Sequence, residues 1–151
     1  MKSISEIIST DTVCDVTAGT KDEVLVELCD IAANTRELVD HKEFLKAIMN
    51  REKIMSTGIG DGVAIPHART TSVKDFVIAV GRSKKGIDFE SLDDLPVHII
   101  ILMGSPERKK NEFLKILEQI GKLLHEPHFK QKFLDATSAD EMSMILLENL
   151  K

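Results

Sequence analysis

The segment from Val97 to Met103 is the feature that most constrains how this chain folds. It reads Val-His-Ile-Ile-Ile-Leu-Met, an almost continuous apolar run rich in β-branched residues. Such runs are typical of a strand buried on both faces of a sheet, because neither set of alternating side chains has to meet water. We therefore expect a central sheet that is covered by helices.

Other strand signals lie at residues 12–16, 62–66 and 76–82. Helical signals lie before and after these strands in an irregular order, which favours a mixed sheet over regular βαβ winding. The sequence has no linker or repeat, and 151 residues are enough for one domain with its own core. The predicted fold is α/β, a single domain over residues 1–151 with a mixed sheet of about four to five strands flanked by helices.

The predicted helices begin at recognisable capping sequences. Thr20, Asp40 and Ser138 are each followed three residues later by Glu, the pattern of a capping box. Another helix is predicted to start at Ser105-Pro106-Glu107, with Pro at the first helical position, and a shorter one covers residues 128–134. The helix that follows Asp40 carries three residues on one face, so Arg51 is expected to continue an inward stripe: Phe44, Ile48 and Arg51.

A glycine-rich loop leads through a short apolar strand and a proline to a histidine. It reads Ser56-Thr-Gly-Ile-Gly-Asp-Gly-Val-Ala-Ile-Pro-His67-Ala-Arg69. Glycines can adopt positive φ and let backbone N–H groups approach an anion, while Pro66 holds the preceding residue extended. A nucleophilic imidazole beside such amides favours phosphoryl chemistry at His67.

The residues of this loop are also compatible with other functions. The spacing G-x-G-x-G puts Val63 where a dinucleotide fingerprint needs its third glycine, and no Lys follows to make a Walker loop. A triad of Ser56, His67 and Asp75 lacks a nucleophile elbow. A hairpin-like turn with an ordinary surface histidine remains an alternative on the residues alone.

The segment from Arg51 to His67 resembles the active-site signature of the fructose/mannitol-type enzyme IIA domains of the bacterial phosphoenolpyruvate-dependent phosphotransferase system. It reads Arg51-Glu-Lys-Ile-Met-Ser-Thr-Gly-Ile-Gly-Asp-Gly-Val-Ala-Ile-Pro-His67. The likeness extends over nearly the whole chain, including Leu95-Pro-Val-His-Ile-Ile-Ile-Leu-Met and the helical C-terminal third. The resemblance implies the same α/β architecture.

The resemblance also implies a phosphotransferase that acts through a phosphohistidine. His67 would accept a phosphoryl group from the phosphocarrier HPr, on Nε2 in that family, and pass it to a IIB domain in sugar uptake. Arg51 would stabilise the phosphate, with Thr57 and the amides of three glycines as further phosphate ligands: Gly58, Gly60 and Gly62. No cofactor, nucleotide or metal is implied.

Two of these residues have structural alternatives. Arg51 near the end of a helix is also suited to complement the helix dipole or to cap carbonyls. The Thr57 hydroxyl is equally suited to a local turn hydrogen bond. The apolar side chains of Ile54, Met55 and Ile59 are expected to pack in the core, with a docking patch for a protein donor as the other interpretation.

The remaining histidines give weaker signals. His98 starts the buried strand and is a possible further site residue at the same sheet edge as His67, although a satisfied, partly buried histidine is the commoner case. His125 and His128 have a metal-like spacing, but Pro127 breaks the helix that would align their rings, so no metal site is expected.

One position departs from the family pattern. Many members have a second active-site histidine at the start of the long helix after the buried strand, and Phe113 occupies that place here. This change puts onward transfer to IIB in doubt and leaves phosphorylation of His67 possible. The alternative function is a stand-alone, nitrogen-related IIA-like regulator whose phosphorylation controls binding to target proteins; a chain expected to carry no IIB or IIC segment slightly favours it.

The composition of the chain limits the kinds of partner that it is expected to bind. The formal net charge of −5 and the 4% aromatic content argue against nucleic-acid binding, which needs a basic face and stacking side chains. No segment approaches the length needed to span a bilayer and no signal peptide is evident, so neither membrane insertion nor export is expected. Cys14 and Cys29 have neither CxxC spacing nor the context of a secreted protein, which favours buried thiols in a reducing compartment, the cytoplasm, over a disulfide.

Overall fold

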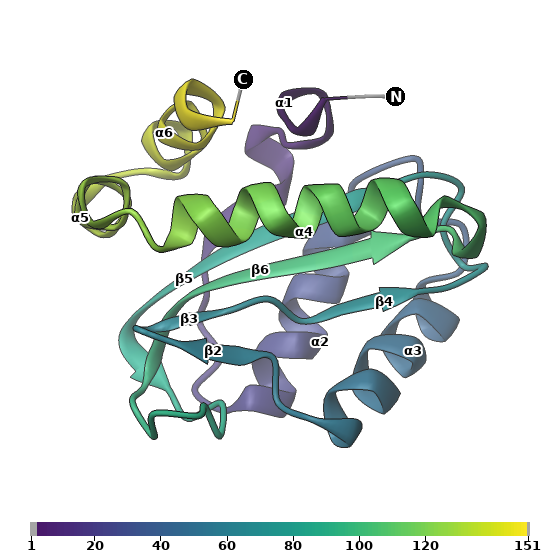
Figure 1. Ribbon diagram of the computed structural model, residues 1–151, viewed down its shortest axis with the longest axis horizontal. Coiled ribbons are helices and arrows are strands. Elements are labelled where there is room, and N and C mark those ends of the chain that lie inside the picture. The colour runs from purple at the N-terminus through teal and green to yellow at the C-terminus, as the bar shows by residue number, and fades with distance from the viewer. Residues whose placement is uncertain (1–2, 151) are drawn as a thin grey trace.

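A computed structural model of the chain describes residues 3–150, which form one mixed sheet with helices on both faces (Figure 1). The sheet has six strands rather than the four to five expected. Their order is β1-β5-β6-β3-β2, with β4 also paired to β6. The strands are β1 (Val13–Asp15), β2 (Gly58–Gly60), β3 (Val63–Ala64), β4 (His67–Arg69), β5 (Val77–Ile87) and β6 (Val97–Ser105).

The central strand β6 pairs antiparallel with β5 and parallel with both β3 and β4. It therefore contacts β3 along its first half and β4 along its second half, because β3 and β4 are successive pieces of one extended segment. Val63 pairs with Ile99, and His67 pairs with Met103. Two strands lie outside the four predicted segments. One is β2, in the glycine-rich loop, and the other is β4, which forms because the predicted segment 62–66 continues beyond Pro66, whose carbonyl accepts a hydrogen bond from Met103 N at 2.9 Å.

The helices divide between the two faces of the sheet. In Figure 1, α2 (Lys21–Ala32) and α3 (His41–Ile54) lie behind the sheet and α4 (Lys110–Leu124) crosses in front of it. The front face also carries α1 (Ile4–Ile7), α5 (Pro127–Asp135) and α6 (Ala139–Asn149). Short 3-10 turns, η1 (Thr10–Thr12) and η2 (Glu107–Lys109), precede β1 and α4.

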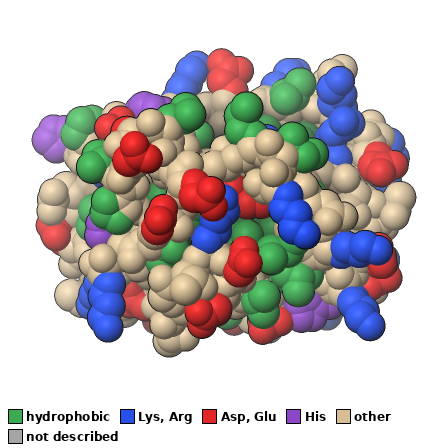
Figure 2. Space-filling model, turned by 90° about the horizontal axis from the view of Figure 1, so that it is seen from below, with side chains coloured by type: hydrophobic (Ala, Val, Ile, Leu, Met, Phe, Trp, Pro, Cys, Tyr) green, Lys and Arg blue, Asp and Glu red, His purple; other side chains and the backbone are tan. Residues whose placement is uncertain are grey.

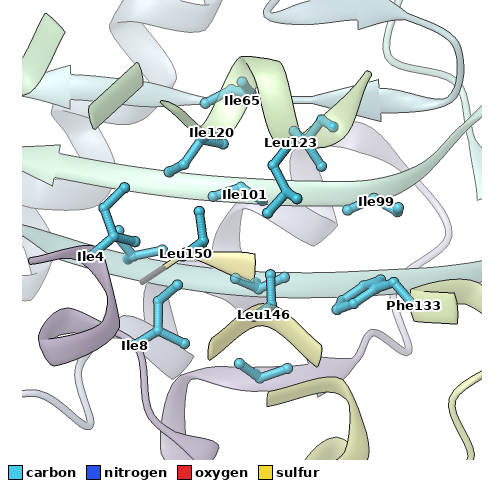
Figure 3. Packing of buried hydrophobic residues seen from close by; sticks show 14 of the residues in the cluster. Ile4, Ile8, Ile65, Ile99, Ile101, Ile120, Leu123, Phe133, Leu146 and Leu150 are labelled. Carbon is cyan, nitrogen blue, oxygen red and sulfur yellow. The ribbon is translucent and has the colours of Figure 1, made fainter. Parts of the chain in front are cut away.

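Two hydrophobic cores fill the space on either side of the sheet. Successive residues of β6 point to opposite faces: Ile99, Ile101 and Met103 pack with α4 to α6, while Ile100 and Leu102 pack with α2 and α3. Figure 3 shows the first core, where Ile120, Leu146 and Leu150 meet the strands. The expectation that the segment 97–103 is buried on both faces is confirmed.

The predicted helix starts are confirmed with one change. Thr20, Asp40 and Ser138 each accept a hydrogen bond from the backbone N–H of the Glu three residues later. Pro106, by contrast, is not inside a helix: it precedes the 3-10 turn η2, and α4 begins only at Lys110. The change has a local cause, since Pro106 is in an extended conformation with ψ at 145°.

Candidate functional site

His67 is the first residue of β4 and lies beside the N-terminal end of α4. Cross-strand partners point to the same face of a sheet, so pairing with Met103 directs the imidazole toward the core beneath α4. The ring is half-buried. Its position therefore depends on the register between β4 and β6.

One ring nitrogen is held by the backbone. Nδ1 lies 2.8 Å from the carbonyl oxygen of Ile65. A carbonyl oxygen only accepts hydrogen bonds, so Nδ1 carries the proton and donates it, and the lone pair of the neutral ring is on Nε2. Within residues 3–150, Nε2 has no hydrogen-bond partner. Nε2 is therefore the ring nitrogen whose lone pair is available to a ligand.

Burial lowers the pKa of His67 below its ordinary value, because a charged imidazolium loses hydration there. The hydrogen bond to the Ile65 carbonyl opposes this lowering. The charge of Arg51 lowers the pKa further, and the carboxylate of Glu52 raises it. The net effect keeps the ring neutral at pH 7, as a nucleophile requires.

Phe113 lies against His67. The two ring centroids are 5.6 Å apart and the ring planes are tilted by 58°. Phe113 lies in the first turn of α4, the part of the chain where the resemblance predicts a second histidine in many family members. Phe113 excludes water from one side of the imidazole and offers no hydrogen bond.

Arg51 lies in the last turn of α3, close enough to His67 for its charge to act on the imidazole. Its Nη1 donates to the carbonyl oxygen of Met55 at 3.0 Å, which caps the end of the helix. Arg51 therefore caps a carbonyl at the end of the helix, as the structural alternative predicts. The residue is half-buried, and its guanidinium keeps further N–H donors for an anion.

Glu52, and not Arg51, continues the buried stripe of α3. The buried residues of this helix are Phe44, Ile48 and Glu52, spaced four apart. The Glu52 carboxylate accepts from Thr57 N at 2.8 Å and from Thr57 Oγ1 at 2.6 Å, and it pairs with Lys21 Nζ at 2.8 Å. The sequence interpretation missed this residue, although the four-residue spacing was a signal that could have found it.

Thr57 is consequently occupied within the protein. It is buried, and its hydroxyl is a donor to Glu52 rather than to the loop backbone. Its carbonyl accepts from Ile65 N at 3.1 Å, across the pairing of β2 with β3. Thr57 therefore joins Glu52 to the segment that leads to His67.

The structure does not gather the glycines around His67. Gly60 and Gly62 form the positive-φ turn between β2 and β3, with φ of 94° and 81°. The carbonyl of Gly62 accepts from His98 N, at the start of β6. His98 is five residues before the partner of His67 on β6, which is about 16 Å at 3.3 Å per residue. Gly58 pairs with Ala64 of β3, and it packs closely against Ser91.

His98 itself is a corrected expectation. It lies at the opposite end of β6 from the position paired with His67, so the two imidazoles do not share one end of the sheet. Its Nδ1 is 2.8 Å from the carbonyl oxygen of Ser83. The side chain is half-buried and hydrogen-bonded, which is the commoner, structural case for a histidine.

The apolar residues of the loop are also placed differently from the expectation of core packing. Ile54 is 79% exposed, Met55 is 67% exposed and Ile59 is 38% exposed. A cavity of about 370 Å³ opens next to Ile54 and Met55, and the paired side chains of Lys21 and Glu52 also line it. Figure 2 shows the molecule from the side on which β2 and the end of α3 lie in Figure 1, and hydrophobic side chains are grouped there among charged ones.

The described part of the chain shows neither a metal cluster nor a spanning helix. Among residues 3–150, no three His, Cys, Asp or Glu side chains are grouped so that they could hold a metal ion. Within the same residues, no helix is both long and apolar enough to cross a bilayer. Cys14 and Cys29 are free thiols, and burial raises their pKa values to about 11 and about 12.

Comparison with known proteins shows the family of the chain. Residues 7–149 match the model of the family described as "Phosphoenolpyruvate-dependent sugar phosphotransferase system, EIIA 2". The match covers nearly the whole chain and includes the signature around His67. The chain therefore belongs to this family of phosphoryl-transfer components, as the sequence resemblance implied.

Some relatives of the chain are named as fructose-specific components and others as nitrogen regulatory proteins. The chain is 36% identical, over 98% of its length, to the fructose-specific EIIABC component of Bacillus subtilis, of which it spans only 24%. It is 32% identical to the fructose-specific EIIA component of Haloferax volcanii, with 86% of this chain and 84% of that protein covered. It is 29% identical to a nitrogen regulatory protein of Pseudomonas aeruginosa, with 89% of this chain and 87% of that protein covered.

Solved structures agree with the fold. The nitrogen regulatory protein IIA-Ntr of Neisseria meningitidis has a TM-score of 0.87 at 30% identity, with 95% of this chain and 98% of that chain covered. IIA mannitol of Escherichia coli has a TM-score of 0.77 at 21% identity, with 95% of this chain and 99% of that chain covered. The predicted α/β architecture is confirmed by both.

Proposed function

We propose that this protein is a phosphotransferase-system IIA component that is phosphorylated on His67 by phospho-HPr and passes the phosphoryl group to a IIB domain in sugar uptake. The observation that carries the proposal is the position of the His67 imidazole, with Nδ1 bonded to the Ile65 carbonyl and Nε2 without a hydrogen-bond partner among residues 3–150. Burial, which lowers the pKa of the ring, favours its neutral form. Supply of phosphoryl groups by HPr also implies a cytoplasmic location.

In the proposed reaction, the Nε2 lone pair attacks the phosphorus atom of the donor phosphohistidine. A new N–P bond forms as the donor N–P bond breaks, and the electron pair of the broken bond returns to the donor imidazole. His67 keeps its proton on Nδ1 throughout. The free N–H donors of Arg51 stabilise the charge that spreads over the phosphoryl oxygens.

The proposal is tested by incubating the full chain with phosphoenolpyruvate, enzyme I and HPr and measuring its intact mass. We expect one acid-labile phosphoryl group on the wild-type protein and on H98A, because His98 lies far from the site. We expect none on H67A. Absence of the group from the wild type, or its presence on H67A, would contradict the proposal.

A second function is favoured by Phe113, which occupies the place of a potential hydrogen-bond partner of a phosphoimidazole. In this alternative the protein is a nitrogen-related IIA-like regulator whose phosphorylation state controls the binding of target proteins. The similarity to IIA-Ntr of Neisseria meningitidis supports it. Transfer from phosphorylated protein to a IIB domain of fructose type separates the two functions: rapid loss of the phosphoryl group supports transport, and retention supports regulation.

A further inference from the structure

Glu52 is a charged group in a place where charges are costly. Its side chain is 5% exposed, and it lies at the end of the apolar stripe of α3. A buried carboxylate is tolerated only with a counter-ion and hydrogen bonds, and Lys21 and Thr57 supply these from two other segments of the chain. An apolar residue would have completed this stripe at lower cost, so the carboxylate calls for an explanation.

Hydrogen bonds connect Glu52, through two intervening residues, to the imidazole of His67. Glu52 binds both the N–H and the hydroxyl of Thr57, and the carbonyl of Thr57 accepts from Ile65 N. The carbonyl of Ile65 in turn accepts from Nδ1 of His67. Two short hydrogen-bonded steps therefore connect the carboxylate to the group that decides which imidazole nitrogen carries the proton.

The same carboxylate joins the two segments that the site needs. Glu52 follows Arg51 directly in the last turn of α3, and Thr57 directly precedes β2, the strand that pairs with β3. In Figure 1 the end of α3 and the start of β2 lie at one corner of the molecule, joined by a short connection. Holding Thr57 against α3 fixes the position of Arg51 relative to the Ile65–His67 segment.

Lys21 connects a third element to this pair. It is the first residue of α2, and its Nζ also donates to the carbonyl oxygen of Phe89 at 3.3 Å and lies 5.2 Å from the centre of the Phe89 ring. Lys21 is thus held on several sides, and it neutralises Glu52 without moving to solvent. The result is a rigid support under the α3–β2 connection.

We propose that Glu52 is a positioning residue for phosphoryl transfer: its buried carboxylate, held by Lys21, fixes Thr57 and thereby the Ile65 carbonyl that keeps His67 in its Nδ1–H form with Nε2 toward the donor. The inference rests on the proposed function for its kinetic consequence. Its structural consequence, the tautomer of His67, is measurable without any phosphoryl donor.

The first measurement is the tautomer of His67, read from two-bond ¹H–¹⁵N correlations of the imidazole in the full chain. We expect the Nδ1–H form in the wild type and a mixture of both neutral forms in E52Q. The amide has one acceptor oxygen instead of two, so it cannot accept from both the N–H and the hydroxyl of Thr57 as the carboxylate does, and it carries no charge to pair with Lys21. D15N, which disturbs an ion pair at the opposite edge of the sheet, should keep the wild-type tautomer.

The second measurement is the rate of phosphorylation by phospho-HPr. We expect E52Q to lower the maximal rate by about tenfold or more, since small displacements of a nucleophile are costly, with little change in KM because Glu52 is not on the surface. T57V removes the hydroxyl contact and keeps the shape of the side chain, so it should lower the rate less, and T57S should restore it. All variants are compared at a temperature at which thermal unfolding shows them folded.

The outcomes separate the two proposals. If E52Q and T57V keep both the wild-type tautomer and the wild-type rate, the role of Glu52 is overturned while the proposed function stands. If the wild type is not phosphorylated, the proposed function fails, and the tautomer of E52Q alone decides the positioning role. Should E52Q not fold, T57V and T57S give the same decision.

Discussion

The orientation of the imidazole at the site is set by three consecutive residues: Ile65, Pro66 and His67. Pro66 has a fixed φ and keeps Ile65 extended, so the Ile65 carbonyl meets Nδ1 of the histidine two residues later. The carbonyl of Pro66 is bound by Met103 N, which ties these residues to the central strand. A short stretch of backbone thus orients the imidazole.

The lowered pKa of His67 predicts a specific dependence of stability on pH. Because the unfolded chain binds this proton more tightly, the stability contributed by the neutral ring is complete above about pH 6.5 and is lost as the pH falls through the lower pKa of the folded state. We expect H67Q to lose less unfolding free energy than the wild type between about pH 7.5 and about pH 5. Urea unfolding at both pH values measures this, and an equal loss in both proteins would contradict it.

Arg51 should contribute to the rate rather than to folding. We expect R51A to slow phosphorylation of His67 by about 100-fold, the usual cost of losing a charge-stabilising donor, and R51K to fall between because Lys lacks the forked guanidinium. Stopped-flow mixing with phospho-HPr and quantification of phosphoprotein gives the rates. An unchanged rate in R51A would leave Arg51 with only its bond to the Met55 carbonyl.

At the scale of the elements, the glycine pattern of the β2–β3 hairpin correctly predicts a turn. It does not predict the function of that turn. Gly60 and Gly62 have the positive φ expected of such residues, but the turn lies beside His98 and not beside His67. Gly58 has no room for a side chain, since an added Cβ would lie 2.2 Å from Ser91 Oγ. The pattern therefore serves packing of the hairpin against the residues before β6.

A pair of glycine substitutions tests this packing role. G58A should lower the unfolding free energy by about 1–3 kcal/mol, the usual cost of overpacking, and S91G should relieve part of the loss in the double variant. The matched control is G121A in α4, where an added Cβ meets nothing within 4 Å and should raise stability by about 1 kcal/mol. Thermal and urea unfolding measure both, and a neutral G58A would contradict the argument.

Across the whole molecule, one buried arginine joins the sheet to the C-terminal helices. Arg82 in β5 is 1% exposed and forms two hydrogen bonds with the carboxylate of Asp15 in β1. Its Nη1 also donates to the carbonyl oxygens of Phe133, Leu134 and Ala136 at the end of α5. It therefore anchors the end of α5 to the edge of the sheet that lies farthest from β2.

Removing this arginine should destabilise the fold without changing the site. We expect R82M to lower the unfolding free energy by about 3 kcal/mol, because it leaves buried carbonyls and a carboxylate without their donor. D15N should cost less, since Asp15 is 47% exposed and Arg82 keeps its carbonyl partners. Urea unfolding gives the values, and the His67 tautomer should stay as in the wild type; equal losses in both variants would contradict this account.

The sequence by itself determined the features that depend on local spacing. These are the α/β class, the doubly buried strand, the three capped helix starts, and the apolar position of Phe113. It also singled out His67, whose phosphorylation remains a prediction. Each of these rests on contacts between residues a few positions apart, or on the burial pattern of one element.

The tertiary structure decided what depends on register and on contacts distant in sequence. The parallel pairing of β3 and β4 with β6 separates the glycine turn and His98 from His67. The packing of α3 buries Glu52 in place of Arg51, and burial beside Phe113 lowers the pKa of His67. Residue types alone do not specify these contacts, because each forms only when segments far apart in the chain are brought together.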